Sequence, residues 1–216
     1  GRFLDKITVR DNYTWHDPER SRGYSRLGWS WSSANGTLVA TDNYWIGGGP
    51  TLEVWKWNRA TFTGNTVYSD SGLEVLLRTL SGQSLSGYAW DQNRYYGSGK
   101  FNYAAKGRSF SSWKAATGKD GHSTYSSAAP SGVWVFVRPN KYEAGRGHVV
   151  VYNWDRRSVV DADVSGVLEV GAEYEVRDAQ NFFGPPVAAG TYHGGTIAVP
   201  MTSTAKARPV GNVPVI

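Results

Sequence analysis

The sequence repeats a short β-type run that ends in a turn pair whose second residue is asparagine. The copies occupy residues 7–12, 38–43 and 60–65. A second motif, Leu-Glu-Val followed by an apolar residue, occupies residues 52–55 and 73–76. Asn43 and Asn65 are 22 residues apart, and Leu52 and Leu73 are 21 apart. A period of roughly 20 residues, with short strands and turn residues between them, predicts a solenoid.

Short, β-branched strands fit the coils of a parallel β-helix better than helical repeats. In such a solenoid, equivalent residues of successive coils stack about 4.8 Å apart. We therefore expect Asn12, Asn43 and Asn65 to form a ladder in which each side-chain amide bonds to the next coil. We also expect these asparagines to adopt the left-handed backbone that the turn requires. The longer spacing between Asn12 and Asn43 predicts an inserted loop at 17–28.

Alternation within residues 51–58 predicts which side chains face outward. Leu52 and Val54 should fill the interior, whereas Glu53, Trp55 and Trp57 should lie on the outer face. The two indole rings would then stand roughly 7 Å apart. Flat apolar rings at this spacing suit contact with successive sugar units. The alternative is that a loop or the second domain covers both rings.

Glu53 and Glu74 are expected to stack one coil apart on this outer face. Carboxylates about 5 Å apart repel each other unless something offsets their charges. Three interpretations stay open: a calcium site, a general acid–base pair with separated pKa values, or solvated carboxylates neutralised by Lys56 and Arg78. As a catalytic pair they would serve a polysaccharide lyase or glycoside hydrolase, with Asp42 as a further candidate.

Aromatic residues are abundant, at 14% of the chain, with 10 Trp and 13 Tyr. Besides the two tryptophans at 55 and 57, we consider Trp45, Tyr95 and Tyr96 as candidates for stacking on sugar rings. The net charge of +5 comes mostly from scattered Lys and Arg, which does not favour nucleic acid as a partner. No apolar run approaches the roughly 20 residues of a membrane span. A secreted protein with a large core can lack cysteine, as this chain does.

The repeat fades near residue 90, so we expect coils at 1–90 and a connecting segment at 91–130. The segment contains one predicted short helix at 109–118, which begins with serines that can cap it and ends at a glycine. His122 follows in an Asp-Gly turn. We interpret it first as a turn residue and second as a catalytic candidate.

A different pattern begins near residue 131 and continues to residue 216. Candidate strands lie at 133–137, 148–152, 159–164, 173–178 and 196–200, with turn residues between them. Short strands with regular turns predict a β-sandwich. We expect this domain to cover the open end of the coils, and the chain after Met201 to follow its surface.

Several segments resemble the region that follows the last coils in secreted bacterial β-helix proteins. They are residues 91–96, 110–123, 137–143, 151–154 and 178–184. With residues 1–90, they make the chain similar to the C-terminal part of a right-handed parallel β-helix protein of the pectate-lyase-like superfamily. The resemblance implies an all-β fold: terminal coils of a right-handed parallel β-helix, one short α-helix, and a small antiparallel β-sandwich.

For function, the resemblance and the aromatic residues together predict a carbohydrate-binding module or accessory domain of a secreted bacterial polysaccharide-degrading protein. Such a module would bind a plant-type glycan through exposed aromatic rings at the cell surface or outside the cell. One alternative is a lyase or hydrolase that uses the outer-face carboxylates, and another is a structural capping or surface protein without a ligand. The expected partner is a polysaccharide, with neither nucleic acid nor membrane, and calcium is the cofactor to test. Because the sequence begins at Gly1 without an apolar leader, we expect a mature protein or part of a longer chain with an upstream β-helix or catalytic domain.

Overall fold

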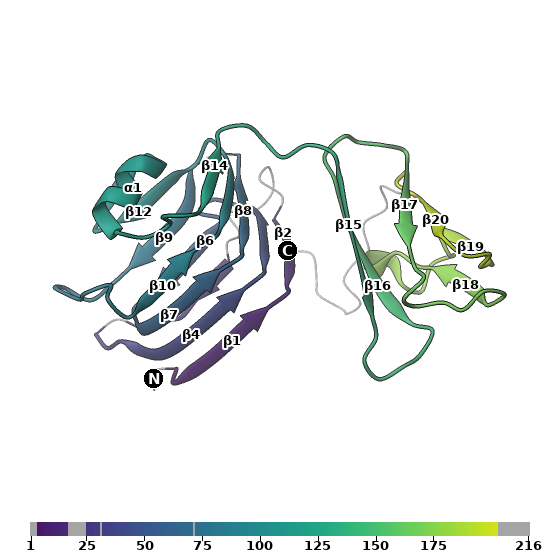
Figure 1. The fold of residues 1–216 in the computed structure, drawn as a ribbon, viewed down its shortest axis with the longest axis horizontal. Helices are drawn as coiled ribbons and strands as arrows, with labels where there is room; N and C mark the ends of the chain where they lie inside the picture. The colour runs from purple at the N-terminus through teal and green to yellow at the C-terminus, as the bar shows by residue number, and fades with distance from the viewer. Residues whose placement is uncertain (1–3, 17–24, 31, 71, 203–216) are drawn as a thin grey trace, which may run out of the picture. The chain divides into compact units, whose positions relative to one another are not determined.

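The protein is built mainly of β-strands and divides into two compact units. The computed structural model describes residues 4–16, 25–30, 32–70 and 72–202. The first unit spans residues 1–130 and the second spans residues 131–216 (Figure 1). Most of the predicted loop at 17–28, and the tail beyond residue 202, lie outside the described residues.

Three parallel sheets form the first unit. Sheet A contains β1 (Lys6–Arg10), β4 (Asn35–Thr41), β7 (Trp57–Thr63) and β10 (Tyr88–Asp91). Sheet B contains β2 (Tyr13–His16), β5 (Tyr44–Gly47), β8 (Thr66–Ser69), β11 (Arg94–Gly97) and β14 (Thr124–Ser126). Sheet C contains β3 (Ser25–Leu27), β6 (Leu52–Trp55), β9 (Leu73–Arg78), β12 (Lys100–Tyr103) and β13 (Lys106–Arg108), of which β13 is antiparallel to β12.

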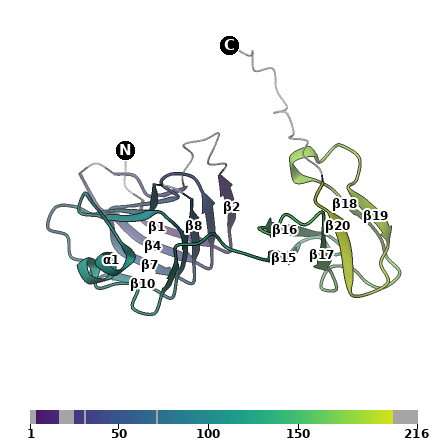
Figure 2. The ribbon, with the colours of Figure 1, turned by 90° about the horizontal axis from the view of Figure 1, so that it is seen from above.

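From β1 to β12 the chain enters the three sheets in rotation, so that three successive strands, one in each sheet, form one coil. Equivalent strands of successive coils lie side by side, as β1, β4, β7 and β10 do in Figures 1 and 2.

Parallel pairing continues past residue 90, where the sequence pattern predicts the coils to end. Strands β10, β11 and β12 pair with β7, β8 and β9, and β14 pairs with β11. The predicted connecting segment therefore belongs to the first unit. The repeat is lost in the sequence because the connection between β9 and β10 has nine residues, 79–87, which moves the next strand out of the 21- to 22-residue period.

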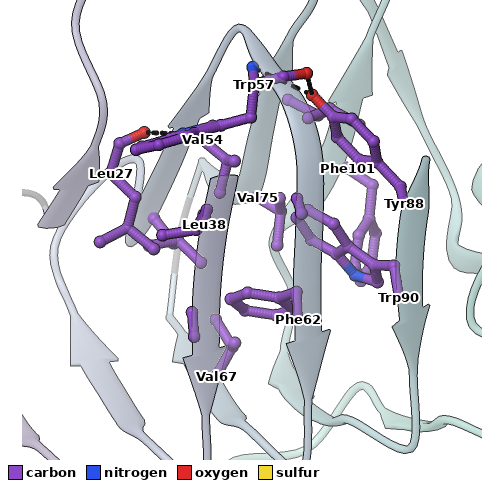
Figure 3. Close-up of a cluster of buried hydrophobic side chains, with 14 of the residues drawn as sticks. Leu27, Leu38, Val54, Trp57, Phe62, Val67, Val75, Tyr88, Trp90 and Phe101 are labelled. Atoms are coloured by element: carbon purple, nitrogen blue, oxygen red, sulfur yellow. Dashed lines mark hydrogen bonds between the residues drawn. The ribbon is translucent and has the colours of Figure 1, made fainter. Parts of the chain in front are cut away.

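Large apolar side chains from all three sheets fill the interior of the first unit (Figure 3). The largest fully buried ones include Trp57, Trp113, Tyr95, Phe62 and Phe101. Phe62 and Trp90 stack with their ring centroids 4.2 Å apart. Burial of a large apolar side chain contributes about 1.5–3 kcal/mol. This interior is therefore the main source of stability for the unit.

The predicted asparagine ladder is present and is one coil longer than expected. The Nδ2 atom of Asn12 donates to Oδ1 of Asn43 at 2.9 Å, and Asn43 donates to Asn65 at the same distance. Asn65 in turn donates to Asn93 at 3.3 Å. Asn43, Asn65 and Asn93 are buried, so these bonds satisfy polar groups that would otherwise destabilise the interior. We call this row of side chains the asparagine column.

Each asparagine of the column is the second residue of a two-residue corner between sheets A and B. The left-handed backbone lies one residue earlier than expected, at Asp11, Asp42, Gly64 and Gln92 (φ 55°, 56°, 70° and 59°). That residue turns the chain and leaves the asparagine free to point along the column. The backbone N–H of Asn43 thereby also donates to Oδ1 of Asn65, at 3.1 Å.

The predicted short helix is α1 (Phe110–Thr117). Its N-cap Ser109 accepts from the backbone of the first turn, and Gly118 ends it in the left-handed conformation with φ 65°. Trp113 is fully buried and lies edge-on to Trp90, with ring centroids 5.9 Å apart. The helix thus covers the interior at the last coil.

Antiparallel strand pairs form the second unit. They are β15 (Val133–Pro139) with β16 (Gly147–Asn153), β17 (Val159–Asp163) with β20 (Thr196–Pro200), and β18 (Glu173–Val176) with β19 (Ala188–Thr191). A short 3₁₀ turn, η1 (Ala179–Asn181), follows β18. Five of the six strands overlap the predicted ones. The sequence pattern missed β19 because Ala-Ala-Gly-Thr has little strand propensity.

Candidate functional site

Trp55 and Trp57 do not form the exposed pair that the alternation predicts. Trp55 is 6% exposed, and Trp57 is fully buried. Strand β6 ends at Trp55, and Lys56, with φ 50°, turns the chain into β7. Trp57 therefore begins a new strand and faces the interior, where its Nε1 donates to the carbonyl of Leu27 at 3.0 Å (Figure 3). The prediction that Trp55 and Trp57 form an exposed sugar-binding pair is therefore wrong.

Trp55 does lie on the outer side of sheet C, but other side chains cover it. The ring of Trp29 stacks on it with centroids 4.8 Å apart. The guanidinium groups of Arg26 and Arg78 each lie 4.7 Å from its ring centroid. Such cation–π contacts contribute about 0.5–2 kcal/mol each. The exposed members of this cluster are Trp29, whose ring is half-exposed, and Arg78.

Glu53 and Glu74 do not stack on each other. Glu53 pairs with Leu76 across sheet C, which makes the coil 23 residues long here (76 − 53) instead of 21. The carboxylate of Glu53 is buried and accepts hydrogen bonds from Nε of Arg26 and, at 3.0 Å, from Nε1 of Trp55. This arrangement holds the cluster around Trp55 together and leaves no second carboxylate beside Glu53.

Glu74 is fully buried and lies at an irregularity of sheet C, where β12 pairs with Leu73 and then with Val75. Neither carboxyl oxygen of Glu74 forms a hydrogen bond with a described residue. Burial raises the pKa of Glu74 to about 9, with the nearby N–H of Gly99 opposing this shift and Asp70 adding to it. The Gly99 N–H lies short of full hydrogen-bond geometry, so it offsets burial only in part.

The two glutamates therefore fit none of the three interpretations: they are neither an acid–base pair nor a calcium site, and both are buried instead of solvated beside Lys56 and Arg78. They do not share a site, and Glu74 is protonated at neutral pH. Within the described ranges, no three His, Cys, Asp or Glu side chains gather as metal ligands either.

Two of the remaining aromatic candidates belong to the core. Trp45 and Tyr95 face the interior and are buried. The hydroxyl of Tyr95 accepts from Nε1 of Trp90 at 3.0 Å and donates to Asp120 at 3.1 Å. Tyr96 follows Tyr95 on β11, so alternation directs it to the outer face, where it is partly exposed.

Tyr96 belongs to a larger group of aromatic residues on the outer face of sheet B, which the sequence pattern did not identify. The strand register places one row across four coils: Trp15, Ile46, Tyr68 and Tyr96. A parallel row contains Tyr13, Tyr44, Thr66 and Arg94. We call these two rows the aromatic face.

Exposure and stacking distinguish this face from the buried clusters. Trp15 is 58% exposed and the tyrosines are partly exposed, whereas Ile46 and Thr66 are fully buried between them. The rings of Tyr13 and Tyr44 stack with centroids 5.2 Å apart. Arg94 donates to the hydroxyl of Tyr44 at 3.4 Å. The face therefore offers flat apolar area with polar groups at its edge, which is the surface that sugar rings require.

A sequence signal for this face exists in relation to the asparagine column. The third residue after each column asparagine is Trp15, Ile46, Tyr68 or Tyr96. It has the same position in every coil because each two-residue corner restarts the alternation at the same phase. Counting three residues on from Asn12, Asn43 and Asn65 finds Trp15, Ile46 and Tyr68, whereas counting from the Leu-Glu-Val motif leads to sheet C.

A polar cluster closes the asparagine column at its C-terminal end. The buried carboxylate of Asp120 accepts from Ser123 Oγ at 2.6 Å, Trp113 Nε1 at 2.7 Å and Asn93 Nδ2 at 3.2 Å. Tyr95 donates to it as well. Burial raises the pKa of Asp120, and the four donors oppose this shift. The cluster therefore provides hydrogen-bond partners for the buried polar groups of the last coil, which is a structural role.

The catalytic candidate His122 lies at the surface beside this cluster. Its Nδ1 is 2.6 Å from Oδ2 of Asp91, and its backbone N–H donates to the same carboxylate at 2.7 Å. These bonds outweigh the effect of partial burial and lower the pKa of Asp91 to about 2. The hydroxyl of Ser123 donates to Asp120 at 2.6 Å and forms no hydrogen bond with His122 among the described residues. Ser123, His122 and Asp91 therefore do not form a nucleophilic triad.

No family model matches the chain, and no curated protein or solved structure is significantly similar to it. Within the described ranges, no helix has the length and apolar character needed to cross a membrane. The functional argument therefore depends on the geometry of the chain itself. In that geometry, the aromatic face is the candidate binding site.

Proposed function

We propose that the chain is a carbohydrate-binding, non-catalytic module of a secreted bacterial polysaccharide-degrading protein, and that a plant-type glycan binds at the aromatic face. The fold proposed with it is the terminal part of a right-handed parallel β-helix in residues 1–130 and a small antiparallel β-sandwich in residues 131–216. Three parallel sheets entered in rotation, and three antiparallel strand pairs, support that fold.

The observation that carries the proposal is the row of rings across sheet B. Strands of a sheet lie about 4.8 Å apart, so Tyr68 lies one strand from Tyr96 and two strands, or roughly 10 Å, from Trp15 across the buried Ile46. The three rings therefore offer contacts along the direction of the coils. A polysaccharide that lies along this row can place successive sugar rings against successive side chains. Stacking needs little rearrangement, because the sheet holds each ring in place.

Neutral plant polysaccharides can serve as the test, in affinity electrophoresis and isothermal titration calorimetry with xylan, mannan and mixed-linkage glucan. We expect the chain to bind at least one of them. Trp15→Ala should weaken that binding at least tenfold, because the most exposed ring of the row is lost. Tyr96→Ala should act in the same direction with a smaller effect.

Tyr142→Ala is the matched control, because Tyr142 is 89% exposed and lies in the second unit. It should leave binding unchanged. The proposal fails if the chain binds none of the glycans, or if Trp15→Ala binds as tightly as the unmodified chain. Thermal unfolding of each variant separates the structural alternative, in which Trp15→Ala would lower stability without affecting any ligand.

A further inference from the structure

A depression on the outer side of sheet A has the size and chemistry of a ligand site. Its volume is about 650 Å³, within the roughly 300–1,000 Å³ typical of small-molecule sites. It lies where β7 and β10 begin, beside the nine-residue connection 79–87. The side chains and backbone that line it include Asn58, Arg59, Gln83, Ser84, Ser86 and Gly87.

The wall of the depression is anchored to the interior of the first unit. The side chain of Gln83 accepts from the backbone N–H of Leu80 at 2.9 Å and donates to the carbonyl of Trp57. The hydroxyl of Tyr88 donates to the same carbonyl at 2.7 Å. Because Trp57 is fully buried, the connection is held by the core, and a ligand would meet a preformed wall.

The floor of the depression requires a glycine. A Cβ atom at Gly87 would lie 2.7 Å from the carbonyl oxygen of Asn58, which is too close for any side chain. The same Cβ position is 3.6 Å from Cγ of Arg59, so the stem of Arg59 runs beside the floor. The close approach of the two backbones brings Asn58 and Arg59 to the wall formed by the connection.

The lining combines polar and apolar surface in similar amounts, and its one charged group is a cation. It offers the amides of Asn58 and Gln83, the hydroxyls of Ser84 and Ser86, and the guanidinium of Arg59, with no carboxylate among the lining residues. Arg59 is exposed and forms no ion pair with a described residue. A guanidinium presents a planar pair of donors that matches an oxyanion, and amides and hydroxyls match sugar hydroxyls.

The same face carries further positive charge. The strand register places Lys6 in the row of Arg59, two strands away through Thr37. Arg10 lies on the same side of β1 as Lys6 because the two are separated by an even number of residues. Cations gathered on one face raise the local concentration of anionic ligands. Asp91 lies on the same face, in the row of Arg10 through Thr63 and Thr41, and offsets one of these charges. The row at the depression itself contains Lys6 and Arg59, which favours an acidic ligand over a neutral one.

We infer that this depression binds a saccharide unit that carries an oxyanion, either a carboxylate or a sulfate ester. Arg59 holds the oxyanion, and the serine and amide groups of the wall hold ring hydroxyls. The site lies on sheet A, whereas the aromatic face lies on sheet B, so it adds a second binding site and does not depend on the first.

The test is an NMR titration of the ¹⁵N-labelled chain with methyl glucuronide and with galactose 6-sulfate. Methyl glucoside, acetate and inorganic sulfate serve as controls. We expect shifts at Ser84, Ser86 and Gly87 with at least one acidic sugar, and at least tenfold weaker binding of methyl glucoside. Acetate and sulfate alone should bind at least tenfold more weakly than the better acidic sugar. The acidic sugar that binds identifies the oxyanion.

Arg59→Gln should weaken binding of the acidic sugar at least tenfold, because it removes the cation from an exposed position that the core does not need. Arg10→Gln removes an equal charge from the same face outside the depression and should change the affinity less than threefold. Equal binding of acidic and neutral sugars would overturn the inference. So would an equal loss in the two arginine variants, which would indicate non-specific attraction.

Trp15→Ala separates this site from the aromatic face. The variant should bind the acidic monosaccharide as the unmodified chain does, even where it no longer binds a neutral polysaccharide. If Trp15→Ala abolishes binding of the acidic sugar and Arg59→Gln does not, the depression is not the site. Failure of the aromatic face leaves the titration at Ser84, Ser86 and Gly87 unchanged.

Discussion

Asp120 and Glu74 are both buried carboxyl groups of the first unit, but their surroundings differ. Asp120 lies at the end of the asparagine column, where four side chains donate to it. Glu74 lies in a strand of sheet C, and neither of its oxygens has a hydrogen-bond partner among the described residues. Burial raises the pKa of both groups.

The difference shows what a repeated polar column does for a buried charge. Asn93, the last residue of the column, donates its side-chain amide to Asp120. Trp113, Tyr95 and Ser123 are the other three donors. Among the described residues, no such row reaches Glu74, the second residue of β9. A buried polar group without partners costs about 1–3 kcal/mol, and a charged one costs more. Glu74 is therefore a weak point of the interior, where the Nε1 of Trp45 and the hydroxyl of Thr66 also lack hydrogen-bond partners among the described residues.

Removing the acceptor at Asp120 should have the largest effect. Asp120→Ala leaves several buried donors without a partner, and each costs about 1–3 kcal/mol. We expect the free energy of unfolding in urea at pH 7 to fall by about 3–5 kcal/mol. Ser123→Ala, which removes a single donor, should cost about 1 kcal/mol. A loss below about 1 kcal/mol for Asp120→Ala would show that the donors find other partners.

Raising the pH should weaken the protein through Glu74. The folded state keeps its proton up to a pKa of about 9, whereas the unfolded chain releases it near the ordinary glutamate pKa of 4.5. The unfolded state then binds fewer protons between these values, so the stability contribution of this group is complete below pH 4.5 and falls as the pH rises toward 9. The loss between pH 4.5 and pH 7 should be roughly 3 kcal/mol.

Urea unfolding at a series of pH values, for the unmodified chain and for Glu74→Gln, measures this effect. Glutamine has a similar shape and does not titrate, so the difference between the two curves isolates Glu74. Parallel curves from pH 5 to pH 9 would mean that the carboxyl group has a partner or access to water. In that case Glu74 would no longer differ from Asp120 as a buried carboxyl group without hydrogen-bond partners.

The smallest effect is expected at Asp91, a carboxyl group with strong donors at the surface. His122→Ala should raise the pKa of Asp91 from about 2 toward the ordinary aspartate pKa of 3.8. The contribution of the pair is present above pH 3.8 and is lost as the pH falls through about 2. NMR titration of the carboxyl carbon measures the shift. Stability at pH 7 should change by less than about 1 kcal/mol, as for other surface pairs.

Much of the fold could be predicted because the corner between sheets A and B leaves a regular mark in the sequence. The asparagines at 12, 43 and 65 identify this corner and the stacking of coils across it. The last coils were missed because a nine-residue connection hides their period. Asn93 is the second residue of the fourth corner, which has the same two-residue length. Its role can be recognised only once β10 and β11 are placed, because Asn93 lies 28 residues after Asn65 and outside the period.

The candidate site was harder to predict because it depends on the phase of each strand. Alternation within 51–58 was applied across Lys56, where the left-handed backbone restarts the phase, so Trp57 was placed on the wrong side. Leu-Glu-Val looked like one repeated motif, yet its copies differ by two residues in register, which separates Glu53 from Glu74. Of the five aromatic candidates, Tyr96 alone lies on the face that we propose to bind sugar.

The connections between the sheets differ in how much their length varies from coil to coil, and the corner between sheets A and B is always two residues long. Every described coil keeps that length, whereas connections from sheet C to sheet A have seven, one and nine residues (28–34, 56 and 79–87). Foreign peptides should therefore be accepted at the second kind of connection and rejected at the first. An engineer could lengthen the wall of the depression or graft a new loop beside it without changing how the coils stack. The fold thus combines a corner of fixed length, between sheets A and B, with connections of variable length between sheets C and A.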